Sequence, residues 1–372
     1  MSASLDHLMQ THLEQYAELE HFSAIQVSIK AGDRIEHYAV GKRSRMPGSE
    51  NLSSSDLFEI GSITKSFTSV LAVLAQSEEQ LQLDGKLRDY LNNYPNWGDI
   101  KLVDLLNMST GIPNYSESPT MNYVFSADLQ RYWATADLVA LVYPQKNNPP
   151  RKPGYFYSNT GYVLMDMILT KLKQKPFSEQ LSETILKPLK LNNMYYPVPN
   201  FPKHIFDRMV HGYSYNIYDN PELLGEDVTE NNLSWAGAAG ALVSNSEDVL
   251  HWIEALFIHD QLLSKEQKST LQKLVSTTTG EPIERTNEKN PRGFSLGLIQ
   301  AYDKSLGRYW YYEGQTIGYR ALYMYVPCNQ VIVVALFNSA TNGENDHAGD
   351  LVNKLYKQLL KENFSLNCRI RV

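Results

Sequence analysis

Residues 57–72 have the sequence LFEIGSITKSFTSVLA, in which an apolar helix is predicted to begin after Gly61. Ser62 and Lys65 are three residues apart, so they share one face of that helix. A serine at a helix start lies beside unpaired backbone N–H groups and the positive end of the helix dipole. A lysine one turn later can act as its base, and this pair is the minimum for covalent acyl transfer.

This SxxK spacing is weak evidence when it stands alone, because serine and lysine are common residues. Ser62 is nevertheless the only serine of the chain that has lysine at the third position after it. The alternative interpretation is an ordinary helix N-terminus followed by a surface lysine. The remainder of the sequence has to decide between the two.

The composition limits the class of protein. The chain has 372 residues, which exceeds the length at which one hydrophobic core usually keeps growing, so we expect two subdomains. The net charge of −7, without a long Lys/Arg run, argues against a nucleic-acid-binding surface. No apolar run reaches about 18 residues, so no transmembrane segment is expected.

The ends of the chain leave two questions open. Residues 1–16 predict a polar amphipathic helix and not a signal peptide. The protein is therefore periplasmic or secreted if a signal peptide has been removed, and otherwise cytoplasmic. Cys328 and Cys368 are the only cysteines, and sequence alone does not decide whether they pair.

Period-two hydrophobicity is found at both ends of the chain, whereas residues from about 60 to 280 are mainly helical in pattern. We therefore predict an α/β (α+β) fold in which both termini build one antiparallel sheet, flanked by helices, with an inserted all-helical domain. The predicted sheet domain comprises residues 1–58 and 285–372, the helical domain residues 59–284, and an active-site cleft lies between them. The C-terminal strands are predicted at Phe294–Gln300, Arg308–Tyr312, Tyr319–Val326 and Val331–Phe337.

Three further segments accompany residues 57–72 along the chain. Residues 105–113 read LLNMSTGIP, Tyr157-Ser158-Asn159 precede an apolar helix, and residues 312–319 read YEGQTIGY. With these motifs in this order, the chain resembles the serine β-lactamase and penicillin-recognising enzyme family over nearly its whole length. Within the family it resembles the branch of class C β-lactamases, D-alanyl-D-alanine carboxypeptidases and esterases.

The resemblance implies a role for each matching residue. Ser62 Oγ would attack a carbonyl carbon, and Lys65 would act as base once burial has lowered its pKa. Tyr157 would relay the proton to the leaving group, and Asn159 would hold Lys65 and the substrate amide. The backbone N–H groups of Ser62 and Gln315 would form the oxyanion hole. Without the resemblance, the segment at Tyr157 indicates only turn chemistry before a helix.

The third segment departs from the family pattern, which usually reads KTG or HxG where this chain has Tyr312-Glu313-Gly314. A cation in that place helps to bind a substrate carboxylate. Tyr312 offers only a hydroxyl group, and Glu313 adds repulsion if it faces the cleft. We hypothesise that a basic residue near the motifs replaces the charge, the alternative being that these residues are solvated surface. The candidates are Arg320, Arg151 and Lys152.

Other chemistries lack their sequence signatures. The nine histidines form no HExxH motif or Cys/His cluster, so no metal is expected. No phosphate-binding GxxxxGK[ST] motif and no GxGxxG after a strand is present, so no nucleotide cofactor is expected. A Gly-x-Ser-x-Gly elbow is also absent, which argues against an α/β-hydrolase.

The sequence therefore predicts a serine hydrolase that works through an acyl-enzyme on Ser62. The first choice is a penicillin-binding carboxypeptidase that cleaves D-alanyl-D-alanine-type peptides. Alternatives within the same fold are an esterase and a β-lactamase, and an alternative from another class is a non-catalytic protein that binds peptidoglycan fragments. The expected partner is a small-molecule or peptide substrate, such as a D-amino-acid peptide, a β-lactam or an ester.

Overall fold

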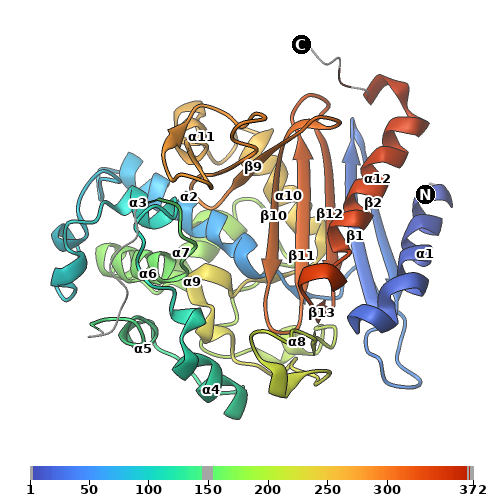
Figure 1. The fold of residues 1–372 in the computed structure, drawn as a ribbon, viewed down its shortest axis with the longest axis horizontal. Coiled ribbons are helices and arrows are strands. Elements are labelled where there is room, and N and C mark those ends of the chain that lie inside the picture. Colours follow the sequence, from blue (N-terminus) through green and yellow to red (C-terminus); the bar gives the residue numbers. More distant parts are fainter. Residues whose placement is uncertain (1–2, 145–153, 367, 369–372) are drawn as a thin grey trace.

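The computed structural model describes residues 3–144, 154–366 and 368. Its central feature is a nine-stranded sheet with the order β2-β1-β12-β11-β10-β9-β8-β6-β7, in which all neighbouring strands are antiparallel. Figure 1 shows helices on both faces of this sheet and a largely helical region beside it. Because β1 and β2 come from the N-terminus and β8–β12 from the C-terminus, the structure confirms the predicted sheet built from both ends of the chain.

The strands differ greatly in length, and two short pairs lie outside the nine-stranded sheet. The sheet strands are β1 (Ala24–Ala31), β2 (Arg34–Gly41), β6 (Leu274–Ser276), β7 (Pro282–Ile283), β8 (Arg292–Phe294), β9 (Ile299–Asp303), β10 (Gly307–Gln315), β11 (Arg320–Val326) and β12 (Val331–Phe337). The two small sheets pair β3 (Phe58–Glu59) with β5 (Val243–Ser244), and β4 (Tyr213–Ser214) with β13 (Ser339–Ala340).

The helices fall into two groups. Over one face of the sheet lie α1 (Ala3–Glu20) and α12 (Ala348–Glu362), side by side (Figure 1). The others are α2 (Thr64–Ser77), α3 (Leu102–Leu106), α4 (Pro119–Ala127), α5 (Thr135–Ala140), α6 (Thr160–Lys173), α7 (Phe177–Leu181), α8 (Lys203–Phe206), α9 (Gly237–Gly240), α10 (Ser246–Phe257) and α11 (Lys265–Leu271). Within the described ranges, no helix has the length and apolar content needed to span a bilayer.

Strand β12 joins the two hydrophobic cores, and all seven of its residues are buried. Val333 and its alternate neighbours contact the core that α1 and α12 form, which includes Leu5 and Leu355. Val334 and its alternate neighbours face the other core, which continues through Trp252 of α10 into the helical region. Each fully buried apolar side chain of this kind contributes roughly 1.5–3 kcal/mol, so this strand is a main source of stability.

The predicted single strand Phe294–Gln300 is wrong, because the structure divides it into β8 and β9. The two strands pair at Phe294 and Ile299, and the turn between them contains Gly297 with φ of 75°, a left-handed conformation that glycine adopts without strain. A Cβ atom on Gly297 would lie 2.8 Å from the carbonyl carbon of Lys65. Glycine therefore lets this turn approach the start of α2.

The C-terminal part of the sheet also begins earlier in the chain than predicted. Strands β6 and β7, at residues 274–283, belong to it although they precede the predicted boundary at 285. The division into a sheet domain and a helical domain otherwise stays a prediction.

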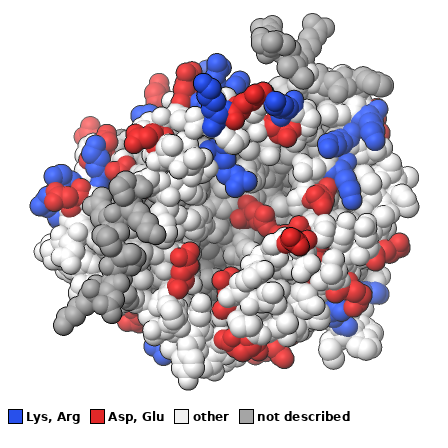
Figure 2. All heavy atoms as spheres, in the orientation of Figure 1, with Lys and Arg blue, Asp and Glu red and all other residues white. Residues whose placement is uncertain are grey.

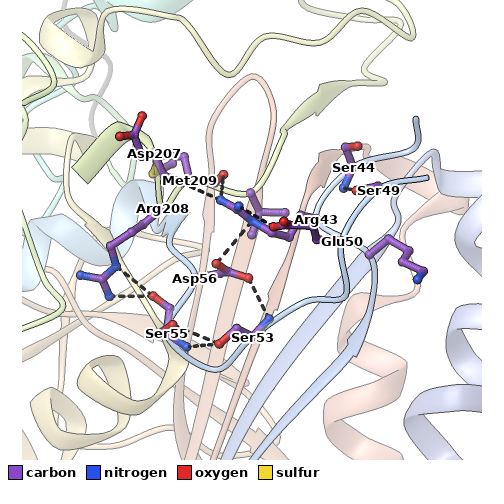
Figure 3. A network of polar contacts seen from close by, with 12 residues as sticks. Arg43, Ser44, Ser49, Glu50, Ser53, Ser55, Asp56, Asp207, Arg208 and Met209 are labelled. Carbon is purple, nitrogen blue, oxygen red and sulfur yellow. Dashed lines mark hydrogen bonds and ion pairs between the residues drawn. The ribbon is translucent and has the colours of Figure 1, made fainter. Parts of the chain in front are cut away.

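A polar network fixes the loop that leads to residues 57–72 (Figure 3). Arg43 donates hydrogen bonds to the carbonyl oxygens of Asp207 and Met209 at 2.8 and 3.1 Å. Arg208 donates to the carbonyl oxygen of Ser55 at 2.6 Å, and its own carbonyl accepts from the backbone N–H of Leu57 at 2.9 Å. The chain therefore enters β3, and then Ser62, from an anchored position.

A disulfide joins Cys328 to Cys368, with their Cα atoms 5.8 Å apart. It ties the turn between β11 and β12 to the segment after α12. Asn329 supports the same junction, because its side chain donates hydrogen bonds to the Tyr356 hydroxyl and the Leu366 carbonyl oxygen. The structure thus pairs the two cysteines, which sequence alone did not decide.

Arg320 lies inside the protein and not in the cleft. Its side chain is fully buried at the start of β11 and forms ion pairs with Glu20 at 2.7 Å and Asp346 at 2.6 Å. Glu20 is also fully buried and additionally accepts a hydrogen bond from the backbone N–H of His347. The hypothesis that Arg320 binds a substrate carboxylate is therefore wrong, because its charge is used to join α1, β11 and the start of α12.

We predict that Arg320→Met lowers the free energy of unfolding by about 3–5 kcal/mol, because it leaves the buried carboxylate of Glu20 without its arginine. Urea denaturation at pH 7 measures the effect. Arg308→Met on the exposed part of β10 is the control and should change stability by less than about 0.5 kcal/mol. Equal stabilities of the two variants would contradict the structural role of Arg320.

Candidate active site

Ser62 lies in a short 3-10 helix, η1 (Gly61–Ile63), that runs directly into α2. It is partly exposed at a cavity of about 550 Å³. Figure 2 shows a hollow near the centre of the face seen in Figure 1, with acidic and basic side chains at its margins. Among the residues that line the cavity are Ser62, Glu117, Tyr157, Asn159, Asp219, Trp235, Arg292, Tyr311, Tyr312, Glu313 and Gln315.

Lys65 is fully buried behind Ser62, one helical turn along the chain. Its Nζ atom donates hydrogen bonds to Ser62 Oγ and to the carbonyl oxygen of Ala239, both at 2.8 Å. Burial lowers the pKa of Lys65, and the neighbouring Tyr157 opposes this change only in part. The amine is therefore positioned and adjusted to take part in proton transfer from Ser62.

Tyr157 approaches Ser62 from the turn before α6. Its hydroxyl oxygen is 2.8 Å from Ser62 Oγ, and Lys65 Nζ lies 5.0 Å from the centre of its ring. Burial alone would raise the pKa of Tyr157, but the charge of Lys65 and hydrogen bonds from Lys65, Ser62 and Tyr312 together lower it. The structure thus brings the predicted nucleophile and both predicted proton carriers into direct contact. Their catalytic roles stay predictions.

Tyr312 takes the place of the basic residue of the family motif, and only 2% of it is exposed. Its hydroxyl oxygen is 3.2 Å from that of Tyr157. Burial raises the pKa of Tyr312 well above its ordinary value, and the proximity of Tyr157 adds to this change. Tyr312 is therefore a neutral phenol whose hydroxyl points at Tyr157.

Asn159 lies beside the cavity but does not hold Lys65 as predicted. Its side-chain nitrogen donates to Ser116 Oγ at 2.9 Å, and its backbone N–H donates to Asn114 Oδ1 at 3.0 Å. In the described part of the chain, no hydrogen bond joins Asn159 to Lys65, because Lys65 is directed at Ser62 and Ala239. Among the described residues, the buried Oδ1 atom of Asn159 has no hydrogen-bond partner.

The end of β10 packs so closely against η1 that no side-chain atom fits between the two backbones. A Cβ atom on Gly314 would lie 2.0 Å from the carbonyl oxygen of Ile60 and 3.0 Å from Ser62 N, and one on Gly61 would lie 2.7 Å from Gln315 N. Gly61 has φ of 50°, which also favours glycine. The two glycines thus bring the backbone N–H groups of Ser62 and Gln315, the predicted oxyanion hole, onto neighbouring segments.

Glu313 lines the cavity next to Tyr312, with part of its side chain exposed. Partial burial of the carboxyl group and the neighbouring Asp346 raise the pKa of Glu313 to about 8. The raised pKa favours the neutral form of Glu313, which weakens the repulsion of anionic substrates that the sequence analysis predicted.

The basic residues near the site are distributed differently from the prediction. Arg320 belongs to the sheet interior, and Arg151 and Lys152 lie outside the described residues. Arg292 on β8, which the sequence analysis did not select, lines the cavity and lies 5.8 Å from the ring centre of Tyr311. Nothing in its local sequence marked it, because the predicted strand began at Phe294, two residues after Arg292.

Two other contributions escaped the sequence analysis for different reasons. The carbonyl oxygen of Ala239 binds Lys65 through the backbone, which no side-chain motif reveals. Asn114 and Ser116 directly follow the segment LLNMSTGIP, and this adjacency was the signal that could have identified them. Across the described residues, no group of three potential metal-binding side chains comes together.

A buried lysine, a serine at a helix start and a tyrosine, joined by hydrogen bonds at a cavity, define a class of serine hydrolases that work by acyl transfer. The model of the family described as Beta-lactamase matches residues 9–357. The chain therefore belongs to the beta-lactamase family and is a serine hydrolase of that family.

Named proteins illustrate this membership. The chain is 23% identical to penicillin-binding protein 4* of Bacillus subtilis (strain 168) over 347 residues, which cover 91% of this chain and 73% of that protein. Among solved structures, D-amino acid amidase from Ochrobactrum anthropi SV3, complexed with L-phenylalanine amide, superposes with a TM-score of 0.81 at 18% identity, over 96% of this chain and 98% of that one. A D-stereospecific amidohydrolase from Streptomyces sp. gives a TM-score of 0.72 at 24% identity, over 90% and 94%.

We predict that Gly314→Ala lowers the free energy of unfolding by about 1–3 kcal/mol and slows acylation of Ser62 at least tenfold, because the new methyl group pushes β10 away from η1. Urea denaturation and the rate of labelling by a fluorophosphonate measure the two effects. Gly349→Ala in α12 is the control, since open space surrounds Gly349. Wild-type labelling by Gly314→Ala would show that the close contact is not required.

We predict that the rate of fluorophosphonate labelling rises with pH, with a midpoint below the ordinary pKa values of 10.5 for lysine and 10.0 for tyrosine. Both shifts are downward, so the Lys65–Tyr157 pair loses its first proton at a lower pH than either free side chain. In Lys65→Arg the guanidinium stays charged, so only Tyr157 can lose a proton and the midpoint of this rise should change. The same pH profile in wild type and Lys65→Arg would exclude Lys65 as a proton acceptor.

Proposed function

We propose that this protein hydrolyses amides and esters whose leaving group carries no carboxylate, through an acyl-enzyme on Ser62, and that D-amino-acid amides are its first substrate class. The observation that supports this proposal most directly is the hydrogen-bonded group of Lys65, Ser62 and Tyr157 at the cavity, with the neutral Tyr312 where a basic residue is usual.

The proposed reaction has two halves. Ser62 Oγ forms a bond to the carbonyl carbon while its proton passes to the Lys65–Tyr157 pair. The C–N or C–O bond of the substrate then breaks, and Tyr157 gives a proton to the departing nitrogen or oxygen. Water hydrolyses the resulting ester of Ser62 by the same proton path, which releases the acid and restores the serine.

The choice of an uncharged leaving group rests on the cavity lining. A substrate carboxylate is usually bound by a charged donor. Tyr312 is neutral and its hydroxyl already contacts Tyr157, so it offers no such charge. Glu117 and Asp219 also line the cavity, which makes it less favourable for an anion and more favourable for a substrate with a free ammonium group.

The similarity to the structures of D-amino acid amidase and D-stereospecific amidohydrolase supports D-amino-acid amides as the first compounds to test. The Oδ1 atom of Asn159 has no hydrogen-bond partner among the described residues, which agrees with this choice, because an amide substrate has an N–H that it could accept.

A second candidate is the carboxypeptidase activity on D-alanyl-D-alanine-type peptides. Two observations favour it, namely the similarity to a penicillin-binding protein over 91% of the chain and the presence of Arg292 in the cavity lining. In this case Arg292 would replace the charge that Tyr312 lacks. β-Lactamase activity ranks lower, because it requires fast deacylation and no described residue is assigned to that step.

We predict that a D-amino-acid amide or ester is hydrolysed at least tenfold faster, in kcat/KM, than a peptide ending in D-alanyl-D-alanine, because binding of the peptide carboxylate lacks a charged hydrogen bond worth about 1.5–3 kcal/mol. Assays of both compounds and of the L-amide measure this preference. Ser62→Ala should abolish turnover, and Ser54→Ala on the exposed loop should not.

Covalent labelling distinguishes the candidate functions. Wild type and Ser62→Ala are exposed to a fluorescent penicillin and to a fluorophosphonate, and the adducts are measured by mass spectrometry. Faster cleavage of the D-alanyl-D-alanine peptide, lost in Arg292→Met, favours the carboxypeptidase. Absence of any adduct on Ser62 with both reagents would overturn the proposal of a covalent hydrolase in favour of a binding protein.

A further inference from the structure

The hydroxyl group of Tyr312 lies beside Tyr157 but has no role in the proposed reaction. It lies on β10 three residues before Gln315, and packing fixes its ring, because Phe294 meets it edge-on at 6.1 Å between ring centres. Phe294 also meets the ring of Tyr157 edge-on, at 6.4 Å. The two tyrosines are therefore held against one aromatic side chain, which leaves their hydroxyl groups a narrow choice of positions.

The hydroxyl groups form a row with the proposed nucleophile. Lys65 Nζ is 2.8 Å from Ser62 Oγ, Ser62 Oγ is 2.8 Å from the Tyr157 oxygen, and that oxygen is 3.2 Å from the Tyr312 oxygen. In the described part of the chain, Tyr157 is the hydrogen-bond partner of the Tyr312 hydroxyl. Tyr312 is thus linked to Ser62 through the Tyr157 hydroxyl.

The direction of the last hydrogen bond follows from the state of the two phenols. Tyr312 keeps its proton, because burial raises its pKa well above the ordinary value. Tyr157 is the phenol that loses its proton more easily, since the charge of Lys65 and hydrogen bonds from Lys65, Ser62 and Tyr312 lower its pKa. When Tyr157 is ionised, Tyr312 is therefore the donor and the Tyr157 oxygen is the acceptor.

The groups around Tyr157 come from several elements. Lys65 supplies the positive charge, and the other groups are neutral hydroxyls. They are Ser62 of η1, Tyr312 of β10, Tyr162 of α6, Tyr115 of the 3-10 helix Tyr115–Glu117, and Tyr155.

We propose that Tyr312 is a positioning residue for the reaction, which donates a hydrogen bond to the Tyr157 oxygen and so stabilises the form of Tyr157 that accepts the proton of Ser62. This inference rests on the proposed function. During attack the Ser62 proton moves to the Tyr157 oxygen, and on collapse of the tetrahedral intermediate it moves to the leaving group. Tyr312 keeps its own proton throughout. A neutral hydroxyl group thus stabilises the ionised Tyr157 at the place where the family motif usually has a basic residue.

The test is the variant Tyr312→Phe, which keeps the ring and removes the hydroxyl. A hydrogen bond to a charged oxygen changes an equilibrium by about ten- to hundredfold. We therefore expect kcat on a D-amino-acid amide to fall by about that factor, and the acid limb of its pH profile to move upward by about one to two pH units. KM should change little, because no substrate contact is lost.

The chain offers a matched control in Tyr323, which lies directly opposite Tyr312 on β11. It is equally buried, and its hydroxyl has no hydrogen-bond partner among the described residues. Tyr323→Phe removes the same group from the neighbouring position and should leave the pH profile unchanged. Thermal unfolding of both variants shows whether the fold is retained.

Direct titration separates this inference from the proposed function. The protein is labelled with ¹³Cζ-tyrosine, the signal of Tyr157 is assigned by its absence in Tyr157→Phe, and its pKa is measured by NMR without any substrate. A higher Tyr157 pKa in Tyr312→Phe, and not in Tyr323→Phe, supports the inference even if no amide or ester is hydrolysed, in which case only the proposed function fails. An unchanged Tyr157 pKa in Tyr312→Phe overturns the inference, whatever its activity.

Discussion

The burial of one lysine amine organises the site. Lys65 is shielded from water on all sides, and an isolated ammonium in such a place would be costly. Its cost is offset by the oxygen atoms of Ser62 and Ala239, and by Tyr157. These partners come from η1, from α9 and from the turn before α6. Three segments distant in sequence must therefore fold correctly before the amine has its partners, so the geometry that supports acyl transfer is also a condition of stability.

The sheet contacts the segment that carries Ser62 and Lys65 through close approaches between backbone atoms. Gly314 and Gly61 let β10 lie against η1, and Gly297 lets the turn between β8 and β9 lie against the start of α2. Short distances between backbone segments cannot relax by rotation of a side chain. The position of Gln315 relative to Ser62 is thus set by the register of β10 in the sheet, while the side chains around it remain free to vary. Tyr312, which departs from the family pattern, is such a variation.

Sequence analysis predicted the features that depend on local sequence pattern and missed those that depend on contacts between residues distant in sequence. The spacing of Ser62 and Lys65 and the apolar run of β12 are local, and the structure shows the expected helix and strand. Arg320 directly follows a residue of the third motif, and this proximity in sequence suggested that it lies in the cleft. Adjacent side chains on a strand point to opposite faces, so the prediction was wrong. The partner of Asn159 is Ser116, 43 residues away, and the main contact of Lys65 beyond Ser62 is a backbone oxygen. Such contacts leave no signature in residue type.

The alternation of β12 between two cores has a consequence for how the chain can evolve. Because Val333 and Val334 face opposite cores, the loss or gain of one residue within the strand would exchange every side chain after it between the two interiors. Substitutions within β12 are tolerated when they conserve volume, whereas insertions and deletions are not. Changes of length among descendants of this sequence should therefore accumulate in exposed loops, and the spacing within the strands should persist long after residue identity is lost.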